Sequence, residues 1–103
     1  MARNYLLYLK DMQASAQKVQ SYTKGIDIET FQEAEQTIDA TFHNLQIIGE
    51  AAKNIPEEVR APYPAVPWRS MAQFRDVVAH HYFGVRLETV WDVVENELPL
   101  IIS

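Results

Sequence analysis

Apolar side chains recur at steps of three and four residues along most of this chain, and no stretch shows the two-residue alternation of a strand. The longest such stripe covers residues 28–55 and consists of Phe31, Ile38, Phe42, Leu45, Ile48, Ala52 and Ile55. A second stripe covers residues 3–23 and consists of Tyr5, Leu6, Leu9, Met12, Ala16, Val19 and Tyr22. This periodicity places the apolar residues on one face of a helix, so both stretches are predicted to be amphipathic helices.

Glycine, aspartate and proline mark where these helices should begin and end. Gly25 follows the first stripe as a C-cap glycine does, and Asp27 is suited to the N-cap of the next helix. The long stretch leaves room for one interruption near residues 33–35 and ends at Pro56. The proline-rich residues 61–67 predict an extended connector.

Two further helices are expected in the C-terminal part of the chain. One runs from about residue 68 to residue 82. Pro67 is well placed as its first residue, and Gly84 is expected to stop it. The other is amphipathic over residues 87–102, and Pro99 is expected to kink or end it.

Four main helices joined by short connections predict an all-α fold, an up-down antiparallel four-helix bundle. A chain of 103 residues has the size of one domain, so residues 1–103 are predicted to form a single domain. Cysteine is absent, and no apolar run has the length of a signal-peptide core or of a membrane span. We therefore expect a cytoplasmic protein without disulfides and without a membrane partner.

Charge is unevenly distributed along the chain. The formal net charge is −5, which argues against a general nucleic-acid binder held by a broad basic surface. Residues 27–39 hold five acids and no base, whereas residues 60–86 hold four arginines and one acid, a balance of +3. A local basic site on an acidic body suits a small anionic group better than a long duplex. Specific DNA binding is not expected, since no helix carries a basic stripe.

The long stripe contains Gly49, followed by Glu50. A glycine in the middle of a helix costs about 1 kcal/mol relative to alanine, so Gly49 is expected to permit close approach by another backbone. Glu50 is either a surface acid, the interpretation that we favour, or an acid that faces a functional site.

Titratable residues are concentrated in residues 74–84, which read Phe-Arg-Asp-Val-Val-Ala-His-His-Tyr-Phe-Gly. Arg75 and Tyr82 are seven residues apart, which places them on one helix face about 10 Å apart. His80 is five residues from Arg75 and lies about 140° around an ideal helix. The side chains of Arg75 and His80 therefore converge only if the helix distorts before Gly84 or if a second subunit supplies the missing partner. This geometry is the main reason to predict a homodimer.

These residue types fit RNA cleavage by transesterification. A histidine, whose ordinary pKa is ~6.5, can take the 2′-hydroxyl proton as a neutral imidazole and protonate the leaving oxygen as an imidazolium. A guanidinium can bind the phosphate in a forked geometry and stabilise its developing charge. The scheme requires no metal and no cofactor, and the sequence has no HExxH motif or carboxylate cluster. The alternative is that His80 and His81 are structural residues at a helix end.

The chain resembles HEPN-domain proteins of the HepT-like family. Their motif of Arg, four residues, His, one residue and Tyr is matched by Arg75, His80 and Tyr82. The resemblance extends over nearly the whole chain and includes the segment Asn-Leu-Gln-Ile-Ile-Gly-Glu-Ala at residues 44–51. It also includes Pro-Trp at 67–68, Tyr-Phe-Gly at 82–84 and Val-Trp-Asp at 90–92.

The resemblance implies an all-helical homodimer with a composite cleft and a metal-independent endoribonuclease activity. Arg75 and His80 would be the catalytic pair of a toxin, and its antitoxin partner would be a minimal nucleotidyltransferase. Tyr82 would be the residue to which that partner transfers AMP, which would block the RNA cleft and repel phosphate. Asp76 would be a supporting residue that orients Arg75, and His81 a bystander or a second supporting residue.

A second function is kept open beside the ribonuclease toxin. The chain could be a non-catalytic helical dimer that binds a nucleotidyltransferase, or that presents a nucleotide or substrate to it. The acidic residues 27–39 fit a protein partner as well as they fit a ribonuclease.

Overall fold

The computed structural model describes residues 5–81 and 84–102, and every side chain among them except those of residues 79–81. These residues form the helices α1 (Tyr5–Thr23), α2 (Ile28–Glu33), α3 (Glu35–Lys53), α4 (Glu57–Arg60), α5 (Trp68–His81), α6 (Leu87–Asn96) and α7 (Leu98–Ile102). The described part of the chain contains no strand, and the predicted all-α class is confirmed.

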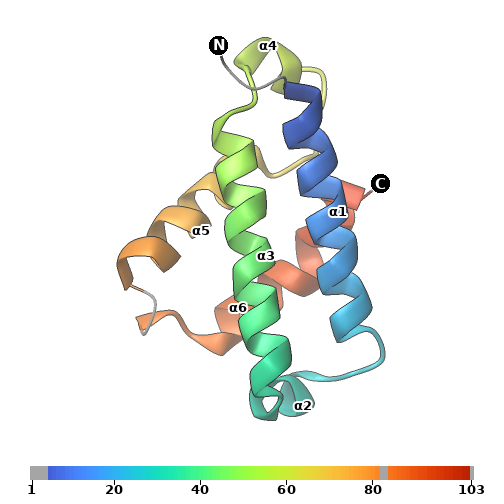
Figure 1. Cartoon of the computed structure of the whole chain (residues 1–103), viewed down its shortest axis with the longest axis vertical. Coiled ribbons are helices and arrows are strands. Elements are labelled where there is room, and N and C mark those ends of the chain that lie inside the picture. The colour runs from blue at the N-terminus through green and yellow to red at the C-terminus, as the bar shows by residue number, and fades with distance from the viewer. Residues whose placement is uncertain (1–4, 82–83, 103) are drawn as a thin grey trace.

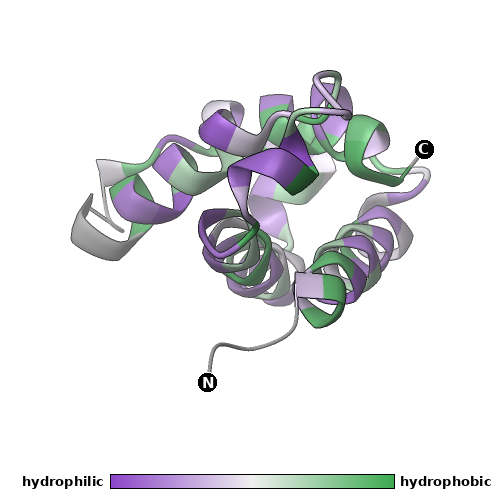
Figure 2. Cartoon of the chain, turned by 90° about the horizontal axis from the view of Figure 1, so that it is seen from above, coloured by the Kyte–Doolittle hydropathy of each residue, from purple (hydrophilic) through white to green (hydrophobic). Residues whose placement is uncertain are grey.

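The two long helices α1 and α3 run antiparallel, side by side, through the length of the molecule (Figure 1). The helix α5 packs on α3, and α7 packs on α1. Seen from above, α5, α6 and α7 form a second layer on one side of the α1–α3 pair (Figure 2). The four predicted helical units are therefore present, with α2–α3 and α6–α7 each forming one broken unit.

The interruption expected near residues 33–35 lies at Ala34, which leaves the helical conformation with φ −97° and ψ 79°. The break turns the short helix α2 so that Phe31 is fully buried. The ring of Phe31 packs against that of Trp91 on α6, with 5.0 Å between the ring centroids. The short helix α2 that the break creates therefore packs against the second layer through Phe31.

The predicted caps around α2 are both observed. Gly25 adopts a φ of +79°, which only glycine tolerates readily, and so ends the α1 unit. The Asp27 carboxylate accepts a hydrogen bond from the Thr30 N–H at 2.9 Å. This bond lowers the pKa of Asp27 below its ordinary value, because it stabilises the charged form.

Proline positions differ slightly from the prediction at two helix ends. Pro67 precedes α5, and its carbonyl accepts the Met71 N–H at 3.0 Å, so Pro67 caps the helix where it was expected to be its first residue. The break expected at Pro99 occurs two residues earlier, at Glu97. Pro99 has no N–H to donate to the Glu95 carbonyl, so the helix must restart before the proline, and Pro99 then lies in the first turn of α7.

The core lies between the two layers. Each longer helix contributes large, fully buried side chains to it, and the short helices α2 and α7 add Phe31 and Leu98: Met12 and Val19 come from α1, Leu45 and Ile48 from α3, Met71 and Val78 from α5, and Val90 from α6. Three residues of the first predicted stripe, Tyr5, Leu6 and Tyr22, are instead exposed near the ends of α1. Among the described residues, no helix combines the length and apolar character that crossing a membrane requires.

Candidate active site

Arg75 occupies a core-facing position of α5. Met71, one turn earlier, and Val78, one turn later, are 1% and 2% exposed. Opposite them on α3 is Gly49, where an added Cβ would lie 2.6 Å from the main-chain oxygen of Met71 and would overlap the Cβ of Arg75. The close approach predicted for Gly49 is therefore present, and it allows the Arg75 stem to lie directly over α3.

The guanidinium of Arg75 emerges from this contact beside two carboxylates. Its Nε lies 3.3 Å from Oε2 of Glu50, and its Nη1 lies 3.5 Å from Oδ1 of Asp76. The side chain of Arg75 remains 33% exposed, so the charged group is accessible while its stem is packed. Glu50 is exposed, as favoured from the sequence, but it also faces Arg75.

Asp76 is shared between two cations, and Lys53 holds it more closely. The Lys53 Nζ donates a hydrogen bond to Asp76 Oδ1 at 2.9 Å, against 3.5 Å for the nearest approach of Arg75. The Lys53 hydrogen bond is the main reason why the pKa of Asp76 lies below its ordinary value. Asp76 is therefore tied first to α3, and its contact with Arg75 is the weaker one.

A groove of about 570 Å³ runs along α1 and α3, and Arg75 forms part of its wall. Volumes of this size are common among ligand sites. The other charged or titratable side chains along it are Tyr8, Asp11 and Lys18 from α1 and His43 and Glu50 from α3. The groove is thus mixed in charge, and an anion entering it at α5 would meet the Arg75 guanidinium together with the Glu50 carboxylate.

The predicted residues His80 and His81 lie in the last turn of α5, and their side chains are outside the description. Tyr82 lies outside the described residues altogether. Because α5 is α-helical through His81, the position of His80 is about 140° around the helix from Arg75. The distortion that would bring the two positions together within one chain is absent from this part of α5.

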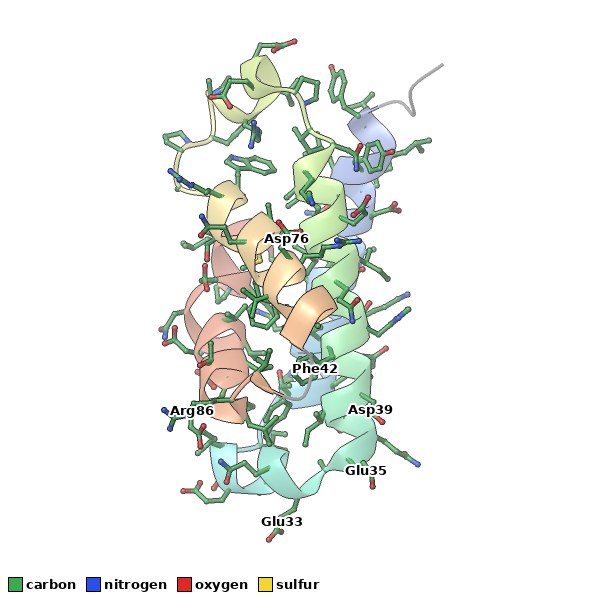
Figure 3. All side chains as sticks on the ribbon, turned by 90° about the vertical axis from the view of Figure 1, so that its left-hand side faces the viewer. Glu33, Glu35, Asp39, Phe42, Asp76 and Arg86 are labelled. Atoms are coloured by element: carbon green, nitrogen blue, oxygen red, sulfur yellow. The ribbon has the colours of Figure 1, made fainter. Side chains whose placement is uncertain are left out.

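The C-terminal end of α5 reaches the edge of the molecule, away from the α1–α3 pair (Figure 1). Val77 on this half of the helix is 48% exposed. Glu33, Glu35 and Asp39 lie at the N-terminal end of α3, where α2 meets it (Figure 3). The acidic segment and the Arg75 region therefore occupy different parts of the molecule.

The basic character of residues 60–86 is largely compensated in the fold. Three of the four arginines pair with acids that lie outside that window: Arg60 with Glu57 at 2.8 Å, Arg75 with Glu50 at 3.3 Å and Arg86 with Glu88 at 3.4 Å. The local excess of +3 counted along the sequence is therefore smaller in space.

The described residues thus form an all-helical domain that carries Arg75 and His80 on one helix. Over residues 12–103 the sequence matches the family model described as "Ribonuclease HepT-like". The chain belongs to the HepT-like ribonuclease family, and the prediction of an endoribonuclease of the HEPN type is confirmed at this level.

Curated relatives agree with this assignment. A "Probable ribonuclease HepT" of Thermococcus cleftensis is 37% identical over 99 residues, which cover 96% of this chain and 90% of the relative. A "Putative RNase" of Methanocaldococcus jannaschii is 38% identical over 92 residues, 89% of this chain and 76% of the relative. Another "Putative RNase", of Caldanaerobacter subterraneus subsp. tengcongensis, is 36% identical over 89% of this chain and 82% of the relative. No solved structure gives a significant match.

Proposed function

We propose that this ribonuclease is the toxin component of a toxin–antitoxin pair and that it cuts RNA in a cleft between two copies of the chain. The observation that carries the proposal is the placement of Arg75, whose stem is packed against α3 while its guanidinium is accessible in a groove. The homodimer is supported by α5, which keeps Arg75 and His80 on different faces of one helix and extends to the edge of the molecule (Figure 1). A cytoplasmic location belongs to the same proposal.

In the proposed reaction, neutral His80 of one subunit removes the proton of an RNA 2′-hydroxyl. The 2′-oxygen attacks the adjacent phosphorus, the bond from phosphorus to the 5′-oxygen breaks, and an imidazolium protonates that leaving oxygen. The products are a 2′,3′-cyclic phosphate and a free 5′-hydroxyl. Arg75 binds the phosphate oxygens and stabilises the charge that they gain in the transition state.

The catalytic pair is tested by Arg75→Ala and His80→Ala, with Arg69→Ala as the control. Arg69 is an exposed arginine in the first turn of the same helix. Each site variant should lose at least about 100-fold in cleavage rate, the scale of a lost acid–base or charge-stabilising group. Circular dichroism and size-exclusion chromatography should show folded protein of wild-type size. Full cleavage by either site variant would reject the proposed pair.

The proposed silencing reaction is AMP transfer to Tyr82 by a minimal nucleotidyltransferase. The tyrosine oxygen would attack the α-phosphorus of ATP, the bond to pyrophosphate would break, and the phenol proton would leave with a base. The added nucleotide would place a bulky anion seven residues from Arg75, which would exclude and repel RNA.

Mass spectrometry after incubation with the transferase and ATP tests this step. We expect one added AMP per chain on Tyr82, no addition to Tyr82→Phe, and loss of RNA cleavage only in the modified protein. Neutralisation of the toxin with Tyr82 unmodified would reject modification as the mechanism, and would favour masking by the partner.

A further inference from the structure

Glu50 is the residue of the Arg75 region to which neither the motif nor the proposed reaction gives a role. It follows Gly49, where an added Cβ would lie 2.6 Å from the main-chain oxygen of Met71 on α5. We propose that Glu50 is a positioning residue, which holds the Arg75 guanidinium by its Nε so that the outer edge is presented to the RNA phosphate. This inference rests on the proposed function, because it assigns Arg75 the phosphate.

The geometry of a guanidinium explains why the Nε contact matters. Its five N–H groups form a rigid planar fork, and two of them can bind one phosphate in parallel. Oε2 of Glu50 lies 3.3 Å from Nε, on the side of the group that is nearest the stem. An ion pair at that position would restrain rotation of the plane, and on the outer edge Nη1 has the longer contact with Asp76.

Lys53 competes with Arg75 for the second carboxylate, which lies near that edge. Asp76 lies 3.5 Å from Nη1 of Arg75, but its Oδ1 accepts a hydrogen bond from Lys53 at 2.9 Å. The shorter, charge-assisted bond is the stronger one. Lys53, one turn after Glu50 on α3, therefore holds Asp76 more closely than Arg75 does. In this proposal Glu50 is the acid that orients Arg75.

The exposure of the pair indicates that its role lies in activity more than in stability. The side chains of Arg75 and Glu50 are 33% and 54% exposed, and ion pairs this exposed contribute little to the free energy of unfolding. Orientation of a charge-stabilising group, in contrast, acts on the transition state. Loss of the Glu50 carboxylate should therefore lower kcat without unfolding the protein.

The test compares Glu50→Gln with Glu58→Gln. Both substitutions remove one exposed carboxylate and keep the side-chain size, and Glu58 lies on α4, away from the groove. We expect kcat on a short single-stranded RNA to fall about 10-fold in Glu50→Gln, with no rise in KM, and to be unchanged in Glu58→Gln. Simple removal of a repelling charge would lower KM and leave kcat intact, so the split separates orientation from a general charge effect.

A second measurement needs no substrate. Hydrogen exchange of the Arg75 Nε–H, followed by 15N NMR and assigned with Arg75→Lys, should be slow in the wild type and in Glu58→Gln and faster in Glu50→Gln. Unchanged exchange in Glu50→Gln would show that the pair does not hold Arg75 in solution. Faster exchange with an unchanged kcat would show that the pair forms but positions nothing for the reaction. Either result overturns the inference, whereas wild-type protein that cuts no RNA rejects the proposed function itself.

Discussion

Arg75 takes part in both folding and chemistry. Its Cβ lies against Gly49 at the packed contact of α3 and α5, whereas its guanidinium lies in the groove between two acids. Helix packing therefore positions the stem of Arg75, and the proposed role of Glu50 is to orient the guanidinium. At this scale, Lys53 and Asp76 connect the same two helices a short distance from Arg75.

The pair of Lys53 and Asp76 should make stability depend on pH. The pKa of Asp76 in the folded state is lowered from 3.8, so the pair stabilises the fold above that value and loses its contribution as the pH falls through the lowered pKa. In Lys53→Met we expect the Asp76 titration midpoint, measured by carboxyl 13C NMR, to move up towards 3.8. The variant should unfold at lower urea concentration than the wild type at pH 7, and this difference should shrink below pH ~4.

Lys24→Met is the matched control for this prediction. Lys24 is exposed just beyond the end of α1, and it lies far along the chain from Asp76. Its removal changes the net charge equally and should leave the Asp76 midpoint in place. An equal shift in both variants would mean that net charge, and not the Lys53 contact, sets the pKa of Asp76.

The motif residues were predictable from the sequence, whereas the residues that contact them in space were not. Arg75 could be singled out because arginine, histidine and tyrosine occur together beside a helix stop. Glu50 and Lys53 lie more than twenty residues earlier, and their contact with α5 depends on how the helices cross. Gly49 was the one sequence feature that could have pointed to them. A glycine that allows another helix to approach closely places the following residue, here Glu50, beside that helix.

At the scale of elements, the crossing of α3 and α5 at Gly49 determines where Arg75 lies. The helices themselves were predictable, because apolar periodicity is a local property of the sequence. The break at Ala34 was placed correctly, whereas the last break lies at Glu97, two residues before Pro99, because the missing N–H of a proline acts on the carbonyl four residues earlier. The crossing could not be placed, since the sequence does not state which helix approaches the glycine.

Gly49→Ala should destabilise the protein although alanine favours a helix. The gain in helix propensity is about 1 kcal/mol, whereas overpacking a tight contact costs about 1–3 kcal/mol, and here the added Cβ meets a main-chain oxygen that cannot move aside cheaply. We expect a net loss of up to about 2 kcal/mol in urea unfolding, together with slower RNA cleavage because Arg75 is displaced.

Gln36→Ala, at an exposed position near the start of α3, is the reference substitution. Its effect should stay within about 0.5 kcal/mol, as is usual for exposed sites. A Gly49→Ala protein more stable than the wild type would show that α5 can shift away from α3 without cost, and would contradict the role assigned to this contact.

At the scale of the whole molecule, the proposed site requires two chains. The sequence left two routes for Arg75 and His80 to meet, and the helical geometry of α5 through His81 favours the route through a second subunit. Neither the homodimer nor the cleft follows from one chain, because the face that a partner covers is not specified by the packing within that chain. The single domain of residues 1–103 likewise stays a prediction.

Mixing two inactive variants should restore activity if each site combines Arg75 of one chain with His80 of the other. Arg75→Ala and His80→Ala, unfolded together and refolded at equal concentration, would form about half mixed dimers, each with one intact site. We expect about a quarter of the wild-type cleavage rate, and none from either variant alone. No activity after mixing, with mixed dimers confirmed by mass spectrometry, would mean that both groups act from the same chain.

The acidic end of the molecule has a consequence for how ionic strength acts on this protein. Glu35 begins α3 and Glu50 lies fifteen residues later, a separation of about 22 Å along the helix. The Debye length is about 8 Å at physiological salt but about 30 Å at 0.01 M. The field of the acidic end is therefore screened before it reaches Arg75 at physiological salt, but not at about 0.01 M. Added salt therefore screens the repulsion between the acidic end and RNA, and it also weakens the attraction between Arg75 and the RNA phosphates. The net effect should be a much flatter dependence of RNA affinity on salt than that of a basic nuclease.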